Sequence, residues 1–158
     1  TGTSSIAKAL TILGYKTSEM LQETPLGNVK KLIESMRDFN FCTATFDYSL
    51  NDIRAIEQAY PSSLFILTER EQDKWYSSFV RFYSNKAGHE SKTEYKNKGQ
   101  YVSQFYTAYN ESVKTHFRGR EWKLLNFYYG QNASWQTLCA YLKKAVPASG
   151  FPHENISK

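Results

Sequence analysis

The sequence predicts an α/β fold with a mainly parallel sheet, organised as a single domain over residues 1–158. Short runs rich in β-formers alternate with segments of helical period, and residues 63–68 form a continuous apolar run between turn residues. Runs of that kind are typical of strands buried on both faces of a parallel sheet. Strands that alternate with helices indicate the same architecture. A chain of 158 residues is long enough for one domain with a sizeable core.

The chain opens with a glycine and four small hydroxyl residues over 1–5, directly before a helical pattern. Ile6, Leu10 and Leu13 have the spacing of one helix face, and Gly14 stands where a C-cap is expected. The N-terminus of such a helix is a good place to bind an anion, phosphate above all. The alternative is an ordinary helix with a Ser or Thr N-cap. Because the pattern starts at residue 1, we expect a buried strand ending in a basic residue ahead of it.

The remaining elements follow from apolar spacing, β-formers and turn residues. In the first half of the chain, we expect a helix within 15–38, a strand over 39–46, a helix capped by Asn51 and stopped at Tyr60-Pro61, and a strand over 63–68. In the second half, we expect a helix carrying Trp75, Phe79 and Phe82, a helix over 100–117, a strand over 123–129 and a helix opened by Ser134. In the helix 100–117, the residues expected to face inward are Tyr101, Phe105, Tyr109 (or Ala108) and Val113. The lysine-rich segment 85–99 has no period and reads as a mobile loop or lid.

Composition narrows the function classes. The formal charge of +5 favours an anionic partner, such as nucleic acid, an acidic glycan or a nucleotide with several phosphates. No run approaches the roughly 20 apolar residues of a membrane helix. Cys42 and Cys139 each lie in an apolar pattern and are expected to be buried free thiols, which favours a reducing compartment. We therefore expect a cytoplasmic protein.

Polar residues follow the predicted strands at the points where ligands bind in open α/β sheets. Ligands of this architecture lie at the carboxyl ends of the strands. The residues at those ends are the stretch 1–5, Asp47 after the strand 39–46, and Arg70 after the strand 63–68. We expect them to converge on one site.

Several short motifs occur in a fixed order across nearly the whole chain. They are Thr1-Gly2-Thr3-Ser4-Ser5, Ala9-Leu10, Leu13-Gly14-Tyr15, Tyr60-Pro61, Phe65-Ile66-Leu67-Thr68, Arg70, Lys74-Trp75-Tyr76, Ser78, Trp135, Leu138-Cys139, Tyr141-Leu142, Phe151-Pro152-His153 and Asn155. The most specific part is Ser78, eight residues after Arg70. In this order the motifs resemble the P-loop-superfamily sulfotransferases that use 3′-phosphoadenosine-5′-phosphosulfate (PAPS). The resemblance implies a three-layer P-loop-type fold, with helices on both sides of the sheet.

The resemblance also implies the activity and the donor site. A sulfuryl group would pass from PAPS to a hydroxyl or amine acceptor by in-line displacement, with adenosine 3′,5′-bisphosphate (PAP) as product and no metal required. Arg70 and Ser78 would clamp the 3′-phosphate, for which the planar guanidinium is well suited. The alternatives are a surface ion pair of Arg70 with Glu69 or Glu71, and a plain helix position for Ser78. The residues expected to bind the 5′-phosphosulfate are Gly2, Thr3, Ser4 and Ser5.

A general base must lie within hydrogen-bond reach of the acceptor. In related sulfotransferases it is a His or acidic residue after the strand between the first loop and the arginine strand, which is the place of Asp47 here. The alternative for Asp47 is a turn or capping aspartate. The sequence departs from the family pattern in two ways: Glu71-Gln72 stands in place of Asp-Pro, and the basic residue expected before Thr-Gly-Thr is not part of the sequence. That basic residue would steady the leaving group.

The histidines have no metal-ligand spacing and no cysteine joins them, so no metal site is expected. We expect His116, Arg118 and Arg120 to lie in solvent, and His153, Trp75 and Trp135 to have structural roles.

Two other functions compete with sulfotransfer. A P-loop-type nucleotide or small-molecule kinase should carry Gly-Lys-Ser/Thr, which is absent, and an acidic Mg²⁺ ligand, for which Asp47 is the one candidate. A basic, aromatic-rich nucleic-acid-binding module should expose its aromatic residues on a sheet face, whereas here most fall at core-facing helix positions. We therefore expect a nucleotide donor and an unidentified acceptor as partners rather than nucleic acid.

Overall fold

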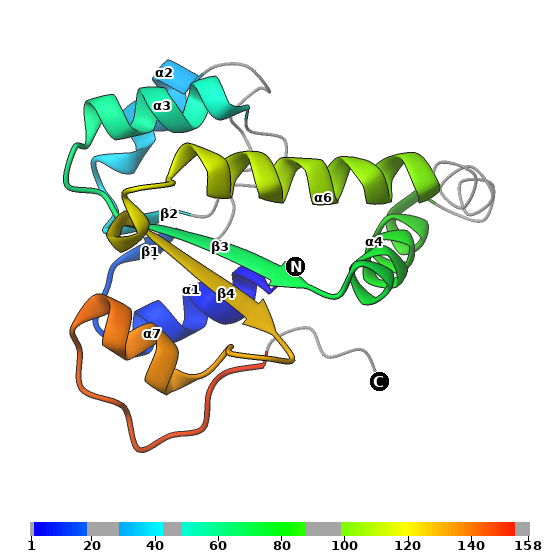
Figure 1. Cartoon of the computed structure of the whole chain (residues 1–158). Helices are drawn as coiled ribbons and strands as arrows, with labels where there is room; N and C mark the ends of the chain where they lie inside the picture. Colours follow the sequence, from blue (N-terminus) through cyan, green and yellow to red (C-terminus); the bar gives the residue numbers. More distant parts are fainter. Residues whose placement is uncertain (1, 19–28, 43–48, 88–98, 154–158) are drawn as a thin grey trace.

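The computed structural model describes residues 2–18, 29–42, 49–87 and 99–153, in which helices and strands alternate (Figure 1). The strands are β1 (Thr17–Ser18), β2 (Phe41–Cys42), β3 (Phe65–Arg70) and β4 (Leu124–Tyr129). The helices are α1 (Thr3–Ile12), α2 (Val29–Met36), α3 (Leu50–Ala59), α4 (Gln72–Ala87), α6 (Gly99–His116) and α7 (Trp135–Leu142), with a 3-10 turn, η1 (Glu121–Lys123). β1 pairs with β2 and β3 with β4, both in parallel. The α/β fold with parallel pairing is confirmed.

Helices cover both faces of the β3–β4 sheet, which makes three layers (Figure 1). Between the sheet and the pair α3 and α6 lies a cluster that includes Val113 and Phe117. On the opposite face, α1 and α7 pack against β4 through Phe127 and Leu138, both fully buried. The predicted layering of helices around the sheet is therefore confirmed.

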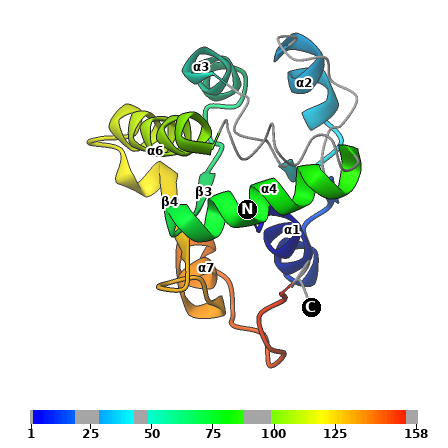
Figure 2. The same cartoon turned by 90° about the vertical axis from the view of Figure 1, so that its right-hand side faces the viewer.

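The register of the β3–β4 sheet runs from Phe65 opposite Leu124 to Arg70 opposite Tyr129. Because side chains alternate along a strand, Phe65 and Leu67 face α3 and α6, while Ile66 faces α1 and α7. Both strands end at the same edge, and Figure 2 shows α4 passing in front of that edge.

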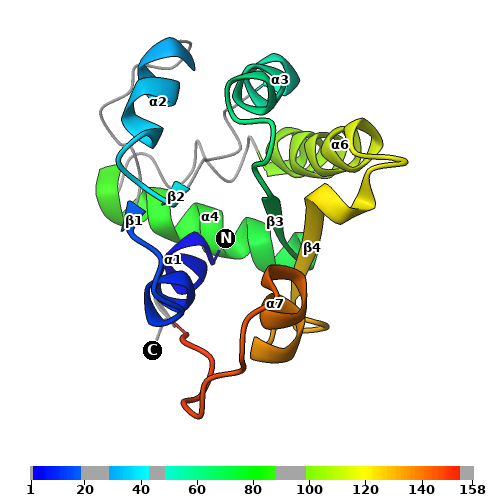
Figure 3. The ribbon, with the colours of Figure 1, turned by 90° about the vertical axis from the view of Figure 1, so that its left-hand side faces the viewer.

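The second sheet is small and separate from the first. It consists of β1 and β2, with Thr17 opposite Phe41, and it lies beside α1 and α2 in Figure 3. The sequence did not predict β1, because a strand of two residues has no readable period. The predicted strand 39–46 is found as Phe41–Cys42, and residues 43–46 lie outside the described residues.

The first helix has the predicted face and the predicted end. Ile6 and Leu10 are buried. Gly14 adopts φ 86°, and the helix closes with hydrogen bonds from Gly14 N to Thr11 O and from Tyr15 N to Leu10 O, both 3.0 Å. These two bonds form a Schellman motif, which satisfies carbonyls that the helix end leaves open.

Two other helix boundaries differ from the prediction. α3 begins at Leu50 with Ser49 rather than Asn51 as N-cap, because Ser49 and Asp52 form a reciprocal capping box. Both ends of the predicted loop 85–99 are helical, since α4 continues to Ala87 and α6 begins at Gly99; residues 88–98 lie outside the described part of the chain. Ser134 caps α7 as predicted, accepting a hydrogen bond from Thr137 N at 3.2 Å.

The inward face of α6 is also corrected. Phe105, predicted to point inward, is 52% exposed, whereas its neighbour Tyr106 is 6% exposed and Asn110 is 4% exposed. Val113 is buried as predicted. Tyr109 packs partly buried against the cluster of Val113 and Phe117, also as predicted. The error is therefore at Phe105, because the polar side chains of Tyr106 and Asn110 take part in the buried face. Among the described residues, no helix has both the length and the apolar composition needed to cross a membrane.

Candidate active site

Gly2 begins α1 in a conformation that favours glycine. It is the N-cap, with φ 82° in the left-handed region. Tyr129, the last residue of β4, donates a hydrogen bond from its hydroxyl to the Gly2 carbonyl at 2.8 Å, and its ring fills the space where a Cβ on Gly2 would stand. No side-chain hydrogen bond caps α1 within the described residues, so the alternative of a Ser or Thr N-cap is wrong.

The first turn of α1 carries the other three residues of the predicted phosphate loop. Ser5 is buried, and Thr3 and Ser4 are half-buried. All three lie at the end of α1 where the helix dipole is positive, which favours an anionic group. The loop therefore begins in close contact with the end of β4.

Tyr129 stands between the loop and Arg70. Burial raises the pKa of the Tyr129 hydroxyl to about 12, and a hydrogen bond with Ser5 and the positive charge of Arg70 act in the opposite direction. The hydroxyl therefore stays protonated at neutral pH and remains a hydrogen-bond donor.

Arg70 is the last residue of β3 rather than the residue after it. Its two acidic neighbours are engaged elsewhere. Glu69 is buried on the α6 side and pairs with Lys114 at 2.9 Å, while Glu71 pairs with Lys74 at 2.7 Å. The alternative interpretation of Arg70 as the partner of Glu69 or Glu71 is therefore wrong.

The Arg70 side chain alternates with that of Glu69, so it faces the side of the sheet that carries α1 and Gly2. Its Nε atom is buried and has no hydrogen-bond partner among the described residues. A buried N–H without a partner is costly, and an anion is the natural acceptor for it. Gly2 and Arg70 thus lie at one edge and on one face of the sheet, and the residue opposite Arg70 in the register is Tyr129.

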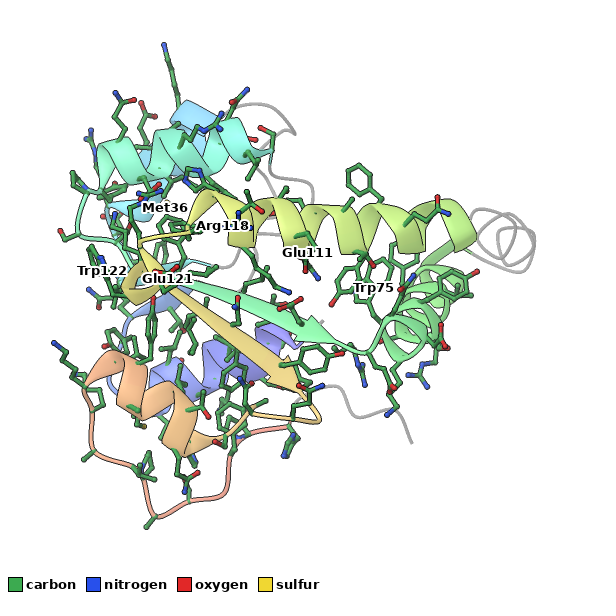
Figure 4. All side chains as sticks on the ribbon, in the orientation of Figure 1. Met36, Trp75, Glu111, Arg118, Glu121 and Trp122 are labelled. Carbon is green, nitrogen blue, oxygen red and sulfur yellow. The ribbon has the colours of Figure 1, made fainter. Side chains whose placement is uncertain are left out.

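Helix α6 contacts Arg70 from the other face. The Tyr106 hydroxyl accepts a hydrogen bond from the Arg70 backbone N–H at 3.1 Å. The ring of Tyr106 stacks on Trp75 of α4, with 4.2 Å between centroids and 12° between planes. Figure 4 labels Trp75 between α4 and α6, and the predicted core role of Trp75 is confirmed by its 2% exposure. Ser78 lies half-buried one turn further along α4.

The predicted base, Asp47, lies outside the described residues.

His153 is exposed and its ring lies 6.1 Å from that of Phe151. Cys139 is a buried free thiol, as predicted, and burial raises its pKa. Trp135 is also buried as predicted, and its indole N–H donates to the Ser149 carbonyl at 2.7 Å.

A cluster of charges lies at the opposite end of the sheet, where β4 begins. The Glu57 carboxylate, on α3, contacts His116 Nε2 at 2.7 Å, Arg120 Nη1 at 2.7 Å and Lys123 Nζ at 2.9 Å. The prediction of a solvated His116 side chain is therefore wrong, because its partner Glu57 comes from a helix distant in sequence. Arg120 pairs with the same carboxylate, but its side chain is still 41% exposed. Arg118 is exposed, as predicted.

The Glu57 carboxylate is strongly stabilised in its charged form. Burial alone would raise its pKa, but hydrogen bonds from Lys123, His116 and Arg120 outweigh that effect and bring the pKa to about 2. This cluster satisfies its charges internally and offers no open acceptor or donor comparable to Arg70 Nε.

The sequence analysis missed Tyr129 and Tyr106. Tyr129 had a usable signal, because it is the last residue of the predicted strand 123–129 and strand ends were the criterion for the other candidates. Tyr106 had none, because its importance depends on contacts with Arg70 and Trp75. Within the described residues, no group of three or more His, Cys, Asp or Glu side chains is placed to hold a metal ion; the absence of a metal requirement stays a prediction.

The α/β fold thus places the glycine-led N-terminus of α1 and the Arg70 side chain at one edge of the sheet, an arrangement suited to an anionic ligand. The model of the sulfotransferase domain family matches residues 1–93 and 81–158, which together span the chain. The chain belongs to the sulfotransferase domain family, as the motifs predicted. A comparison with curated proteins finds no match.

Proposed function

We propose that this chain transfers a sulfuryl group from PAPS to a hydroxyl or amine acceptor and releases PAP. Membership of the sulfotransferase domain family supports the reaction type. The observation that carries the donor assignment is Arg70, whose buried Nε has no partner among the described residues, at the sheet edge shared with Gly2. PAP has a phosphate at each of two positions, so its two anionic groups match the two sites.

In this proposal the 3′-phosphate is held by Arg70 and Ser78. The arginine provides charge and a forked donor geometry, and the serine provides a hydroxyl from α4. The 5′-phosphosulfate is held at the positive end of α1. The residues assigned to that end are Gly2, Thr3, Ser4 and Ser5.

The reaction needs little covalent participation from the protein. The acceptor atom attacks sulfur in line, the bond from sulfur to the 5′-phosphate oxygen breaks, and the acceptor proton passes to a base, which we assign to Asp47. PAPS supplies the activated sulfuryl group, and the residues of the chain orient it and stabilise charge. Asp47→Asn should abolish transfer without weakening PAP binding, and unchanged turnover would remove Asp47 from the mechanism.

The competing functions have less support. A single-strand nucleic-acid binder needs aromatic side chains on an open sheet face, but helices cover both faces of the β3–β4 sheet (Figure 1). For a kinase, the match to the sulfotransferase domain family favours sulfuryl transfer over phosphoryl transfer.

Calorimetry with PAP and ATP, each with and without MgCl₂, tests the proposal. We expect micromolar PAP binding that is independent of Mg²⁺. ATP binding that requires Mg²⁺, together with no PAP binding, would favour the kinase and overturn the donor assignment. A panel of glycan, lipid, peptide and small alcohol acceptors, incubated with labelled PAPS, then identifies the acceptor. The cytoplasmic location stays a prediction, supported by the buried free thiol of Cys139.

A further inference from the structure

Tyr106 holds the backbone of Arg70 at both of its polar groups. The Tyr106 hydroxyl accepts a hydrogen bond from Arg70 N at 3.1 Å and donates one to Arg70 O at 3.4 Å. Tyr106 is 6% exposed, so this contact is shielded from water. Arg70 is the final residue of β3, where the pairing with β4 ends. One side chain of α6 therefore fixes the position at which the strand stops.

The Tyr106 ring is itself firmly placed. It stacks on Trp75 at 4.2 Å, and Trp75 stacks on Phe79 at 5.3 Å, so α4 and α6 are joined through three aromatic rings. Trp75 is 2% exposed. Ser78 lies on α4 between Trp75 and Phe79 in the chain. Tyr106 thus contacts the backbone of one proposed 3′-phosphate ligand and the helix that carries the other.

Within the described part of the chain, no hydrogen bond or ion pair anchors the Arg70 side chain. Its acidic neighbours Glu69 and Glu71 pair with lysines, and its Nε has no hydrogen-bond partner among the described residues. The direction of the guanidinium therefore depends on the backbone from which it projects, and that backbone is held by the Tyr106 hydroxyl.

We infer that Tyr106 is a positioning residue for recognition of the 3′-phosphate: its hydroxyl fixes Arg70, and through Trp75 it keeps α4 and Ser78 in register with Arg70. This inference rests on the proposed function. Tyr106 does not touch the nucleotide; it acts through Arg70.

The chain offers a matched control in Tyr141. The Tyr141 hydroxyl, from α7, donates to the Phe65 carbonyl at 3.1 Å, which is a bond to the same strand at its opposite end. Tyr106→Phe and Tyr141→Phe each remove a hydroxyl that makes a part-buried hydrogen bond to β3 and keep the ring, so they should lower the melting temperature by similar amounts. They should differ in ligand recognition.

The test measures dissociation constants of PAP and adenosine 5′-monophosphate (AMP) by calorimetry for the wild-type chain and both variants. The two ligands differ only by the 3′-phosphate. For Tyr106→Phe we expect the Kd of PAP to rise about three- to tenfold while that of AMP stays within about twofold, as loss of the positioning hydroxyl predicts. For Tyr141→Phe we expect both constants to stay within about twofold of wild type.

Equal weakening of PAP and AMP binding in Tyr106→Phe would make the residue merely structural and overturn the inference. So would an unchanged PAP constant in that variant, or a PAP-specific loss in Tyr141→Phe. These results leave the proposed function standing if the wild-type chain prefers PAP to AMP. A wild-type chain that binds neither ligand would overturn both.

Discussion

The two ends of the β3–β4 sheet treat buried charge in opposite ways. At the end where the strands begin, Glu57 receives three donors, and no charge there lacks a partner within the cluster. At the end where they finish, Arg70 keeps a buried Nε without a partner among the described residues. A protein that optimised stability alone would satisfy both ends. The contrast supports the proposal that one end serves stability and the other serves ligand binding.

The largest effect on stability should come from the Glu57 cluster, at the end where the strands begin. Glu57→Gln keeps the shape of the side chain but leaves the buried Lys123 ammonium without its counter-charge. We expect a loss of about 3 kcal/mol in the free energy of unfolding, the low end for a broken buried ion pair. Urea unfolding measures it, and PAP affinity should not change. Glu71→Gln, which breaks an exposed pair with Lys74, is the control and should leave the melting temperature unchanged.

Arg70→Gln should have the reverse effect: it should weaken PAP binding and leave the free energy of unfolding nearly unchanged. We expect PAP affinity to fall about 100-fold, because a charged, forked donor to phosphate is lost. The free energy of unfolding should stay constant or rise by about 0.5 kcal/mol, since an unpartnered buried group is removed. Calorimetry and urea unfolding give the two numbers. Arg118→Gln, at an exposed arginine, should change neither. A large loss of stability in Arg70→Gln would contradict the view that the two ends of the sheet differ in what they contribute to stability.

Gly2→Ala should show a smaller, mixed effect. The added methyl group meets the Tyr129 ring, and φ 82° is unfavourable for alanine. We expect a loss of about 2 kcal/mol in the free energy of unfolding together with weaker PAP binding. Gly14→Ala shares the positive φ, at 86°, but has open space around its Cβ position. It should cost about 1 kcal/mol and leave PAP binding unchanged.

Acid should destabilise the Glu57 cluster by neutralising the same carboxylate. The effect on stability should be small near neutral pH. The pKa of Glu57 is lowered from 4.5 to about 2 in the folded chain, so its contribution to stability is complete above pH 4.5 and is lost as the pH falls from 4.5 toward 2. Wild type should lose stability in that window faster than Glu57→Gln. Parallel curves from urea unfolding between pH 5 and pH 2 would contradict the assignment.

Much of the architecture was predictable because it is encoded locally. The strand 123–129, the helix opened by Ser134 and the face of Ile6 and Leu10 follow from spacing and caps, and the structure confirms them. Boundaries were less certain where two capping residues compete. Ser49 displaced Asn51 because its partner Asp52 completes a capping box, a pairwise effect that single positions do not reveal.

The candidate site was predictable only in part. Gly2 and Arg70 were found because strand ends and motif spacing mark them, and the structure brings them to one edge. Tyr106 and Glu57 were not found, because their contacts join residues 36 to 66 positions apart. Their roles depend on tertiary packing, which a periodicity argument does not contain. The structure shows where Gly2 and Arg70 lie, but their roles in binding stay predictions, as do those of Thr3, Ser4, Ser5, Ser78 and Asp47.

The bond between Tyr129 and Gly2 joins positions 127 residues apart, nearly the full length of the chain. During synthesis Gly2 emerges well before β4, yet this hydrogen bond to its carbonyl cannot form until β4 has docked. Contacts of such long range form late, since their loop-closure entropy is offset only once intervening structure has folded. The shape of the first turn of α1 and the docking of β4 are thereby coupled: a chain that lacks β4 has the residues of that turn but not the strand that holds their backbone.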